Sequence, residues 1–341
     1  MQTVIVIPCH NEARLIERTA RSLGFGSDAP PPTDTRLVLV ENVSTDNTWA
    51  ALSRIQARSP AAAVIAVREP ELGYVPPRHR GTLIARELAA AEGIHPDELL
   101  ILQGDGDTVY EPGYVDAMRV ASLHAGRNCM VEATTHSPHR FLHDHPGFQA
   151  LADEIDVEME RFAVPEQRDV IIDDKVAGYR LGDYNRWGGH RRDFTSRGAE
   201  VHAETTRLYI RALRAGATKV RASNAFAQPS RRKIQRNPVR HFASAGFPRE
   251  EAWWRDWNAH YSGPNNLSAF DDPGQIAALQ PAVEMRRAHL LALFSSVPRA
   301  VDSAFAREMA SKPNRMTFRR AVGALLNDDL GMFFELLLPK P

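Results

Sequence analysis

The sequence has few cysteines, no excess of either charge and no long hydrophobic segment. Its two cysteines, Cys9 and Cys129, cannot form a disulfide framework, so we expect a reducing cytoplasm. Lys plus Arg and Asp plus Glu number 42 each, so no overall field favours nucleic acid or an anionic membrane. No apolar run approaches the roughly 20 residues of a membrane helix, and the run that begins at Val4 stops at Pro8, unlike a signal peptide. We therefore predict neither a membrane span nor a nucleic-acid partner.

The 341 residues, 43% hydrophobic and 25% charged, have the balance of a globular protein with ample core. Short apolar runs alternate with helical patterns through the first third of the chain. The runs predict strands at residues 4–8, 37–40, 62–67 and 99–103, and the patterns predict helices at 13–23, 46–55 and 79–91. This alternation predicts an α/β fold whose largely parallel sheet is covered by helices on both faces.

Polar residues follow three of these strands directly. They are Asn11 and Glu12 after the first strand, Glu41 and Asn42 after the second, and Asp105 and Asp107 after the fourth. In open parallel sheets, ligands bind beyond the carboxyl ends of the strands. We therefore expect these side chains to lie at one ligand-binding edge.

The turn Gly-Asp-Gly-Asp at residues 104–107 brings two carboxylates together. Asp105 and Asp107 are two residues apart and project the same way from an extended segment, and Gly106 leaves room for a ligand to approach the main chain. Two carboxylates roughly 5 Å apart repel by about 3 kcal/mol at an effective dielectric near 20. A divalent cation that also binds substrate phosphates would offset this repulsion. A metal site is one interpretation of the turn, and a solvated acidic turn is the other.

Four segments together resemble the successive landmarks of family 2 glycosyltransferases, which have the GT-A fold. They are VIVIPCHNE (4–12), LVLVENVSTDNT (37–48), RGTLIARE (80–87) and LILQGDGDTVYEP (100–112). The chain departs from the family in having Glu41 where Asp is usual and Val43 where Gly is usual. The resemblance implies a GT-A domain over residues 1–240, with a nucleotide-sugar-binding half (1–115) and an acceptor half (116–240). A helical C-terminal region would occupy residues 241–341.

The resemblance also implies a nucleotide pocket at the strand ends. Pro8, Asn11 and Glu12 would frame this pocket, and Glu41 or Asn42 would read the base or ribose by hydrogen bonding. The expected donor is a nucleotide diphosphate sugar, with uridine as the expected nucleoside.

The acidic turn and two basic residues would hold the ribose and the diphosphate. By the same resemblance, Asp105 touches ribose or bridges through the metal, and Asp107 ligates Mn²⁺ or Mg²⁺ bound to the diphosphate. Arg80, opening the predicted helix at 79–91, would meet a phosphate, with an exposed basic residue as the alternative. Arg231, in the basic cluster after the predicted edge strand 219–226, would meet the diphosphate or a charged acceptor, with a solvated charge run as the alternative.

The segment GAEVHAETTRLYIRALRAG (198–216) resembles the acceptor half of the same enzymes, where an acidic residue opens a helix that ends in Ala-Gly. Alignment on Arg211 puts the family's Glu-Asp pair on Glu204 and Thr205. The base carboxylate is therefore assigned to Glu204, or to Glu200 in a shifted register. Such a base contributes about 10²–10⁴-fold to the rate. The alternative for Glu204 is charge stabilisation of the helix N-terminus.

The segment 134–147 is expected to be a loop and contains four histidines: His136, His139, His143 and His145. A zinc site is one interpretation, but no cysteine accompanies them, and His-Pro and Pro-His pairs are typical of irregular surface segments. Contact with a sugar acceptor is the other interpretation. Helical spacings at 282–294, 301–309 and 318–326 predict C-terminal helices that shape the acceptor site or a homodimer.

We predict a cytoplasmic, metal-dependent glycosyltransferase that acts on an unidentified acceptor with inversion and a carboxylate base. A sugar nucleotidyltransferase is the alternative enzyme, although PCHNEARL lacks the Gly-rich basic loop that it would need. A non-catalytic nucleotide-binding scaffold is the third possibility. Asp105 and Asp107 argue against the scaffold, and Thr205 in place of an Asp argues for it.

Overall fold

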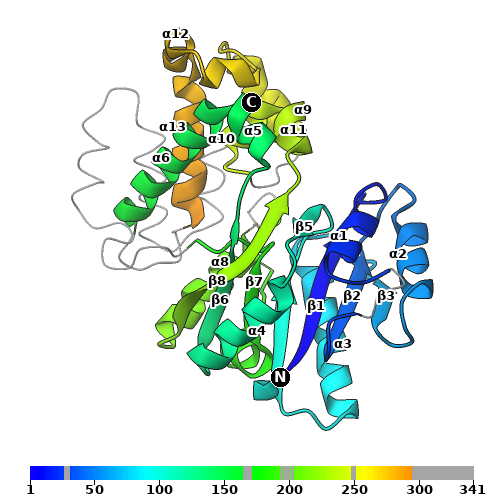
Figure 1. Cartoon of the computed structure of the whole chain (residues 1–341). Coiled ribbons are helices and arrows are strands. Elements are labelled where there is room, and N and C mark those ends of the chain that lie inside the picture. Colours follow the sequence, from blue (N-terminus) through cyan, green and yellow to red (C-terminus); the bar gives the residue numbers. More distant parts are fainter. Residues whose placement is uncertain are drawn as a thin grey trace. The chain divides into compact units, whose positions relative to one another are not determined.

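The computed structural model describes residues 1–26, 31–163, 171–192, 194, 200, 203–246 and 251–293 (Figure 1). Packing divides the chain into two compact units. Unit 1 comprises Met1–Ser137, Ile172–Arg192 and Glu204–Ser230. Unit 2 comprises the described residues between 138 and 171, between 193 and 203, and from 231 onward. Our sequence-based division is a single cut after residue 240, and it stays a prediction.

Unit 1 is built on an eight-stranded sheet in the order β3-β2-β1-β4-β7-β6-β8-β5. The strands are β1 (Gln2–Cys9), β2 (Thr35–Glu41), β3 (Val64–Arg68), β4 (Leu99–Gln103), β5 (Thr108–Tyr110), β6 (Cys129–Thr135), β7 (Ala177–Arg180) and β8 (Thr218–Pro229). Strands β1 to β4 are parallel, and β6 is parallel to β8, whereas β7 runs antiparallel to β4 and β6, and β5 antiparallel to β8. This mixed, mainly parallel sheet confirms the predicted α/β class.

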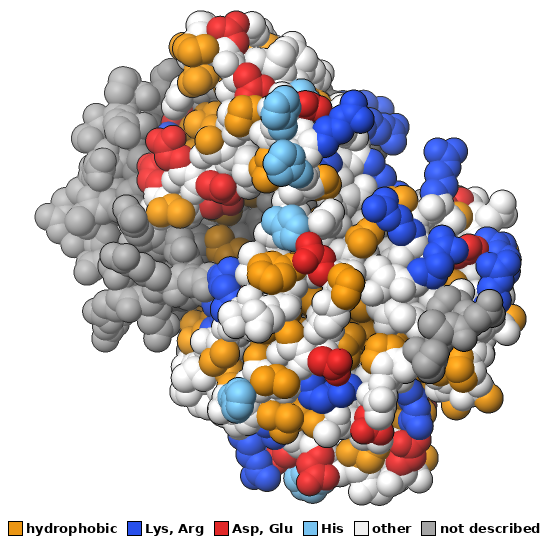
Figure 2. Space-filling model, in the orientation of Figure 1, with side chains coloured by type: hydrophobic (Ala, Val, Ile, Leu, Met, Phe, Trp, Pro, Cys, Tyr) orange, Lys and Arg blue, Asp and Glu red, His pale blue; other side chains and the backbone are white. Residues whose placement is uncertain are grey.

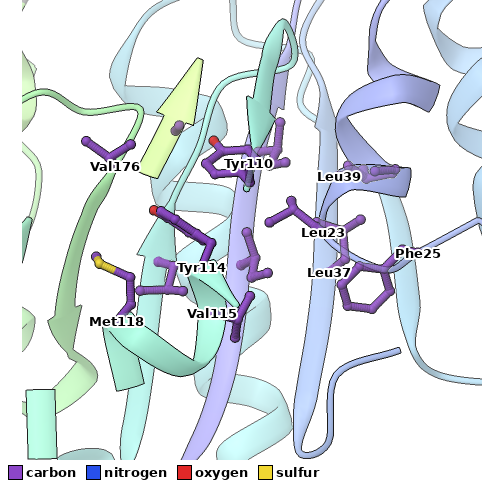
Figure 3. Packing of buried hydrophobic residues seen from close by; sticks show 14 of the residues in the cluster. Leu23, Phe25, Leu37, Leu39, Tyr110, Tyr114, Val115, Met118 and Val176 are labelled. Carbon is purple, nitrogen blue, oxygen red and sulfur yellow. The ribbon is translucent and has the colours of Figure 1, made fainter. Parts of the chain in front are cut away.

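Helices cover both faces of this sheet. They are α1 (Ile16–Ser22), α2 (Thr48–Ala57), α3 (Val75–Ala91), α4 (Tyr114–Ala125), α7 (Leu181–Arg186) and α8 (Glu204–Arg214), with a 3₁₀ turn η1 at Pro96–Glu98. Because side chains alternate along a strand, Ile5 and Ile7 enter the core under α1, α2 and α4, which Figure 3 shows in part. Val4 and Val6 enter the opposite core, under α3, α7 and α8. Burial on both faces explains the continuous β-branched run of β1.

Three local predictions were wrong. Helix α3 begins at Val75 rather than at residue 79, because two prolines fit its first turn, where no backbone donor is needed. Strand β8 is not an edge strand, since the short β5 folds back to pair with it. The segment 134–147 is not all loop, because His139–Asp144 forms helix α5.

The described part of unit 2 is helical. Besides α5 it contains α6 (Pro146–Ala163), α9 (Arg232–Arg236), α10 (Pro238–Ala243), α11 (Glu251–His260), η2 (Leu267–Phe270), α12 (Pro273–Ile276), η3 (Ala277–Leu279) and α13 (Gln280–Leu293). Phe148, Phe242 and Phe270 pack edge to face, with ring centroids 4.9 to 5.8 Å apart. Arg286 of α13 donates to Asp156 of α6 at 2.8 and 2.7 Å. The helices predicted at 301–309 and 318–326 lie outside the described residues.

Three predictions from composition can be compared with the described residues. Among the helices that the structure describes, none has the length and apolarity needed to cross a bilayer. Basic and acidic side chains both occur on the face drawn in Figure 2, in keeping with their equal totals. Cys9 and Cys129 are buried free thiols.

Candidate active site

The loops that follow β1 and β2 hold each other mainly through hydrogen bonds between neutral groups, with one further bond from the N–H of Ala13 to the Asp46 carboxylate at 3.3 Å. The backbone N–H of Thr45 donates to Asn11 Oδ1 at 2.8 Å, and the N–H of Asn11 donates to Ser44 Oγ at 3.1 Å. The N–H of Glu12 donates to Thr48 Oγ1 at 2.8 Å. Asn11 takes a positive φ of 56°, a conformation that Asn tolerates better than most residues. The structure therefore brings Asn11 and Glu12 against the second loop, as the motif spacing predicts.

Asn42 supports the chain that leads into α3. Its Nδ2 donates to the carbonyl oxygens of Glu69 at 2.9 Å and Glu71 at 2.8 Å, and its Oδ1 accepts from the N–H of Gly73 at 3.3 Å. An amide side chain has two N–H donors, and both are used here. Asn42 thus fixes the backbone of residues 69–73, which follow β3.

Glu41 ends β2 with a buried carboxylate. Its Oε1 accepts from the N–H of Ser44 at 2.5 Å, and its Oε2 lies 3.7 Å from Nε of Arg68. The Arg68 guanidinium stacks over the Trp49 ring, 4.4 Å from its centroid. Pro8, half-buried in β1, lies opposite Val40 of β2, one position before Glu41. Glu41 is therefore at the sheet edge, held by a turn amide and near an exposed cation.

The acidic turn after β4 packs against the first loop. A Cβ on Gly106 would lie 3.0 Å from Cγ of Glu12, so the absence of a side chain permits this close approach. Thr19 Oγ1 of α1 donates to the carbonyl of Gly106 at 3.1 Å. Asp105 is partly exposed, and Asp107 is buried with its carbonyl accepting from Ser230 N–H at 3.1 Å.

A buried arginine that the sequence did not single out joins the acidic residues. Arg78 Nη2 donates to Asp105 Oδ1 at 3.0 Å and to Asp174 Oδ2 at 2.8 Å. Its Nε donates to Glu204 Oε1 at 2.8 Å and its Nη1 to Gln103 Oε1 at 3.0 Å. The Arg78 side chain is only 5% exposed. The guanidinium thus gathers groups from the end of β4, from the segment before β7 and from the start of α8.

The environment shifts the ionisation of this cluster. Burial alone would lower the pKa of Arg78, but Asp174, Glu204 and Asp105 raise it above its ordinary value, so the guanidinium stays charged. Although 30% of the Asp174 side chain is exposed, burial of its carboxyl raises its pKa to about 7. Arg78 acts against that shift, and Asp105 and Glu204 add to it.

Carboxylates outnumber cations in this cluster. Lys175 Nζ lies 2.8 Å from Asp173 Oδ1 and 3.9 Å from Asp174 Oδ1. Neighbouring carboxylates, Asp173 foremost, raise the pKa of Lys175 against the lowering effect of its burial, so this amine is also charged. Four carboxylates therefore share two cations: Asp105, Asp173, Asp174 and Glu204 with Arg78 and Lys175. A proton or a divalent cation would offset the excess negative charge.

The oxygen donors of the turn suit a hard cation that arrives with a diphosphate. Among the residues that the structure describes, no three His, Cys, Asp or Glu side chains stand close enough to hold a metal by themselves. Mg²⁺-like ions are commonly held by one or two carboxylates, with substrate phosphates completing the shell. Asp105 and Asp107 would supply those two carboxylates, and the surplus of negative charge around Arg78 favours the cation.

The segment that contains the ends of β1, β2 and β4 matches a known family model. Residues 4–116 match the model described as glycosyl transferase family 2. The match assigns this segment, about a third of the chain, to glycosyltransferase family 2. A search among curated proteins finds no match.

The solved structures that resemble this chain share little sequence with it. S. aureus TarS (1–349) has a TM-score of 0.47 at 14% identity, covering 99% of this chain and 90% of that one. Mannosyltransferase PcManGT from Pyrobaculum calidifontis, in complex with GDP-Man and Mn²⁺, has a TM-score of 0.48 at 16% identity, covering 98% and 87%. Glucosyl-3-phosphoglycerate synthase from Mycobacterium tuberculosis has a TM-score of 0.38 at 17% identity, covering 66% and 70%. At these values none of them assigns a donor or an acceptor.

The two arginines near the start of α3 have different surroundings. Because α3 begins at Val75, Arg80 lies in its second turn and does not open the helix. Two residues span about 200° around a helix, so Arg78 and Arg80 point to opposite sides. Arg78 is buried and Arg80 half-buried. The phosphate role of Arg80 stays a prediction.

Two predicted site residues, Glu200 and Arg231, belong to unit 2, as do three of the four histidines. Glu200 forms an isolated bridge with Phe194, and the Arg231 guanidinium lies 5.7 Å from the Phe141 ring centroid. His136 belongs to unit 1, where its Nε2 is 3.1 Å from Glu111 Oε1. The roles assigned to Glu200, Arg231 and the histidines stay predictions.

Segment 172–176, which the sequence left unassigned, positions Asp174. Thr206 Oγ1 of α8 accepts from the N–H of Ile172 at 3.0 Å, and Glu132 Oε1 of β6 accepts from the N–H of Asp173 at 2.7 Å. The Asp-Asp-Lys run before a short apolar strand was the signal that could have identified this segment.

Proposed function

We propose that the enzyme transfers a sugar from a nucleotide diphosphate sugar to an acceptor hydroxyl in the cytoplasm, with inversion and with Mn²⁺ or Mg²⁺. The observation that carries this proposal is the set of carboxylates around Arg78 at the carboxyl end of β4. That set adjoins the interlocked loops after β1 and β2, which is where nucleotides bind in open α/β sheets.

The donor's nucleoside and diphosphate would contact different groups. Glu41 is the proposed base or ribose contact, because Asn42 has both its N–H donors engaged by Glu69 and Glu71. Asp105 is the proposed ribose or metal contact. Asp107 would hold the cation, and uridine remains the expected nucleoside.

The cation, when bound by Asp105 and Asp107, would act as a Lewis acid on the departing diphosphate. The chain's own contribution is to keep these carboxylates in place beforehand. Arg78 fixes one oxygen of Asp105, and the contact between Gly106 and Glu12 fixes the turn itself. Fixed donors need little reorganisation when charge develops.

The acceptor hydroxyl must lose its proton, and two carboxylates of the Arg78 cluster are the proposed candidates for the base. Glu204 is the base that the family resemblance implies, and it opens α8 with a side chain only 5% exposed. Asp174 shares the same guanidinium but is 30% exposed, which favours it as a second candidate. A base within hydrogen-bond reach of its substrate contributes about 10²–10⁴-fold.

A melting scan with nucleotides tests the donor site without knowledge of the sugar. UDP or GDP with Mn²⁺, at about 100 times the dissociation constant, should add roughly 2.7 kcal/mol of stability. The shift should vanish with excess chelator, whereas a nucleoside monophosphate should depend less on metal. Asp107→Ala should remove only the metal-dependent part, with the exposed Asp116→Ala on α4 as the matched control. No shift with UDP, GDP, TDP or ADP plus Mn²⁺ would defeat the proposal.

The products separate this function from its alternatives. A glycosyltransferase releases a nucleoside diphosphate from the donor, and excess chelator should stop that release. A sugar nucleotidyltransferase would release pyrophosphate from a nucleoside triphosphate and a sugar phosphate. A scaffold would show the melting shift and neither product.

A further inference from the structure

One tyrosine hydroxyl connects the two acidic segments of the site. Tyr110 of β5 is 2% exposed. Its Oη accepts from the backbone N–H of Asp105 at 3.2 Å and donates to the backbone carbonyl of Lys175 at 2.9 Å. The hydroxyl therefore links the turn after β4 to the segment before β7, main chain to main chain.

The ring that carries this hydroxyl is fixed from several sides. Tyr110 and Tyr114 pack with ring centroids 4.6 Å apart in the core that Figure 3 shows. The N–H of Tyr110 donates to Ser22 Oγ at 3.0 Å, and the residue pairs with Ala227 of β8. A Cβ on Gly104 would lie only 2.6 Å from Tyr110 Oη, so only glycine leaves room for the hydroxyl.

The link complements the one made by Arg78. Arg78 joins the side chains of Asp105 and Asp174, and it would release or exchange them as charges in the site change. The Tyr110 hydroxyl is neutral and forms hydrogen bonds with backbone groups. These two bonds therefore do not depend on the ionisation of Asp105 or Asp174. It sets the distance between the two segments.

We propose that Tyr110 is a positioning residue that holds the Asp105 turn and the Asp173–Lys175 segment at the spacing needed to receive a cation with a nucleoside diphosphate. The inference rests on the proposed function. Groups that orient metal ligands from behind typically account for 10–100-fold in metal affinity. Removal of the hydroxyl should therefore weaken metal-dependent binding by about that factor.

The chain offers a matched control for this test. Tyr114 has the same side chain in the same core, and within the described residues its buried Oη has no hydrogen-bond partner. Tyr110→Phe and Tyr114→Phe each remove one buried hydroxyl and keep the ring. They differ in that only Tyr110→Phe breaks the link to Asp105 and Lys175.

The experiment is a calorimetric titration of both variants and the wild type with UDP or GDP, with and without Mn²⁺. Tyr110→Phe should weaken Mn²⁺-dependent binding by about 10–100-fold, and Tyr114→Phe should change it less than twofold. The electron paramagnetic resonance lines of bound Mn²⁺ should broaden in Tyr110→Phe alone. Equal binding by the two variants would overturn the positioning role while leaving the proposed function intact.

A second variant keeps the proposal testable if Tyr110→Phe fails to fold. Gly104→Ala puts a methyl group 2.6 Å from the hydroxyl and should displace it, with the same loss of Mn²⁺-dependent binding. Normal Mn²⁺-dependent binding by a folded Gly104→Ala protein would contradict the inference. Failure of the wild type to bind any nucleotide would overturn the proposed function, and the inference with it.

Discussion

The sheet edge of unit 1 contains two polar regions that differ in kind. The loops after β1 and β2 are joined mainly by neutral hydrogen bonds among amides, hydroxyls and backbone groups, as at Asn11 and Asn42. The Arg78 cluster is joined by ionised groups at the end of β4. Both regions contain residues of the segment that matches the family, and the second carries most of the buried charge.

The difference predicts unequal sensitivity to mutation. A neutral hydrogen bond contributes about 0.5–1.5 kcal/mol net. Loss of one partner from a buried ion pair costs about 3–5 kcal/mol, because the remaining charge is left uncompensated. The loops should therefore tolerate single changes better than the Arg78 cluster does.

The largest expected effect is that of Arg78→Met. Loss of the guanidinium leaves Glu204 buried without its cation, so we expect the free energy of unfolding to fall by about 3–5 kcal/mol, measured in urea. Arg80→Met is the matched control on the same helix, and it should change stability by less than about 0.5 kcal/mol. Equal effects of the two substitutions would remove the distinction between the two arginines.

The next effect concerns rate. Glu204→Gln keeps an acceptor for Arg78 Nε and removes the base, so kcat should fall by at least about 10²-fold with little change in the KM for the donor. Asp174→Asn and Glu200→Gln, measured alongside, identify the base. A near-wild-type Glu204→Gln with an inactive Asp174→Asn would move the role to Asp174, and with an inactive Glu200→Gln it would move to Glu200.

The strands that carry the first region could be predicted because their signals are local. The β-branched runs of β1 and β2 identify their own strands, and the Gly-Asp-Gly-Asp run identifies the turn after β4. Arg78 could not be found in this way, since its four partners lie between 25 and 126 positions away along the chain. An error of four residues in the start of α3 also directed attention to Arg80, on the other side of the helix.

A smaller effect is expected in the neutral region. Asn42→Ala removes the partners of two carbonyls and one N–H at residues 69–73, which should cost about 1–3 kcal/mol of stability. It should also raise the KM for the donor, because residues 69–73 follow β3 at the edge of the sheet where the donor is proposed to bind. Asn47→Ala, at the exposed start of α2 where the side chain makes no cap, should stay within about 0.5 kcal/mol. If Asn42→Ala lowered the free energy of unfolding as much as Arg78→Met does, the two regions would not differ in their sensitivity to mutation.

The smallest effect is a pH dependence that only the charged region should show. The pKa of Asp174, raised by burial to about 7, means that the folded state binds a proton there more tightly than the unfolded state does. The tighter binding of this proton stabilises the folded state fully below the ordinary aspartate pKa. This stabilisation is lost as pH rises toward about 7. Asp174→Asn stays neutral, so its melting temperature relative to wild type should rise between pH 5 and pH 8 in chelator. Because the side chain is partly exposed, the change should not exceed about 1 kcal/mol.

Asn47→Ala, scanned in parallel, adds no titrating group, so its melting temperature should differ from that of the wild type by a constant amount. A constant difference for Asp174→Asn as well would show that this carboxyl is ionised across the range, and that the cluster holds its full negative charge without a proton.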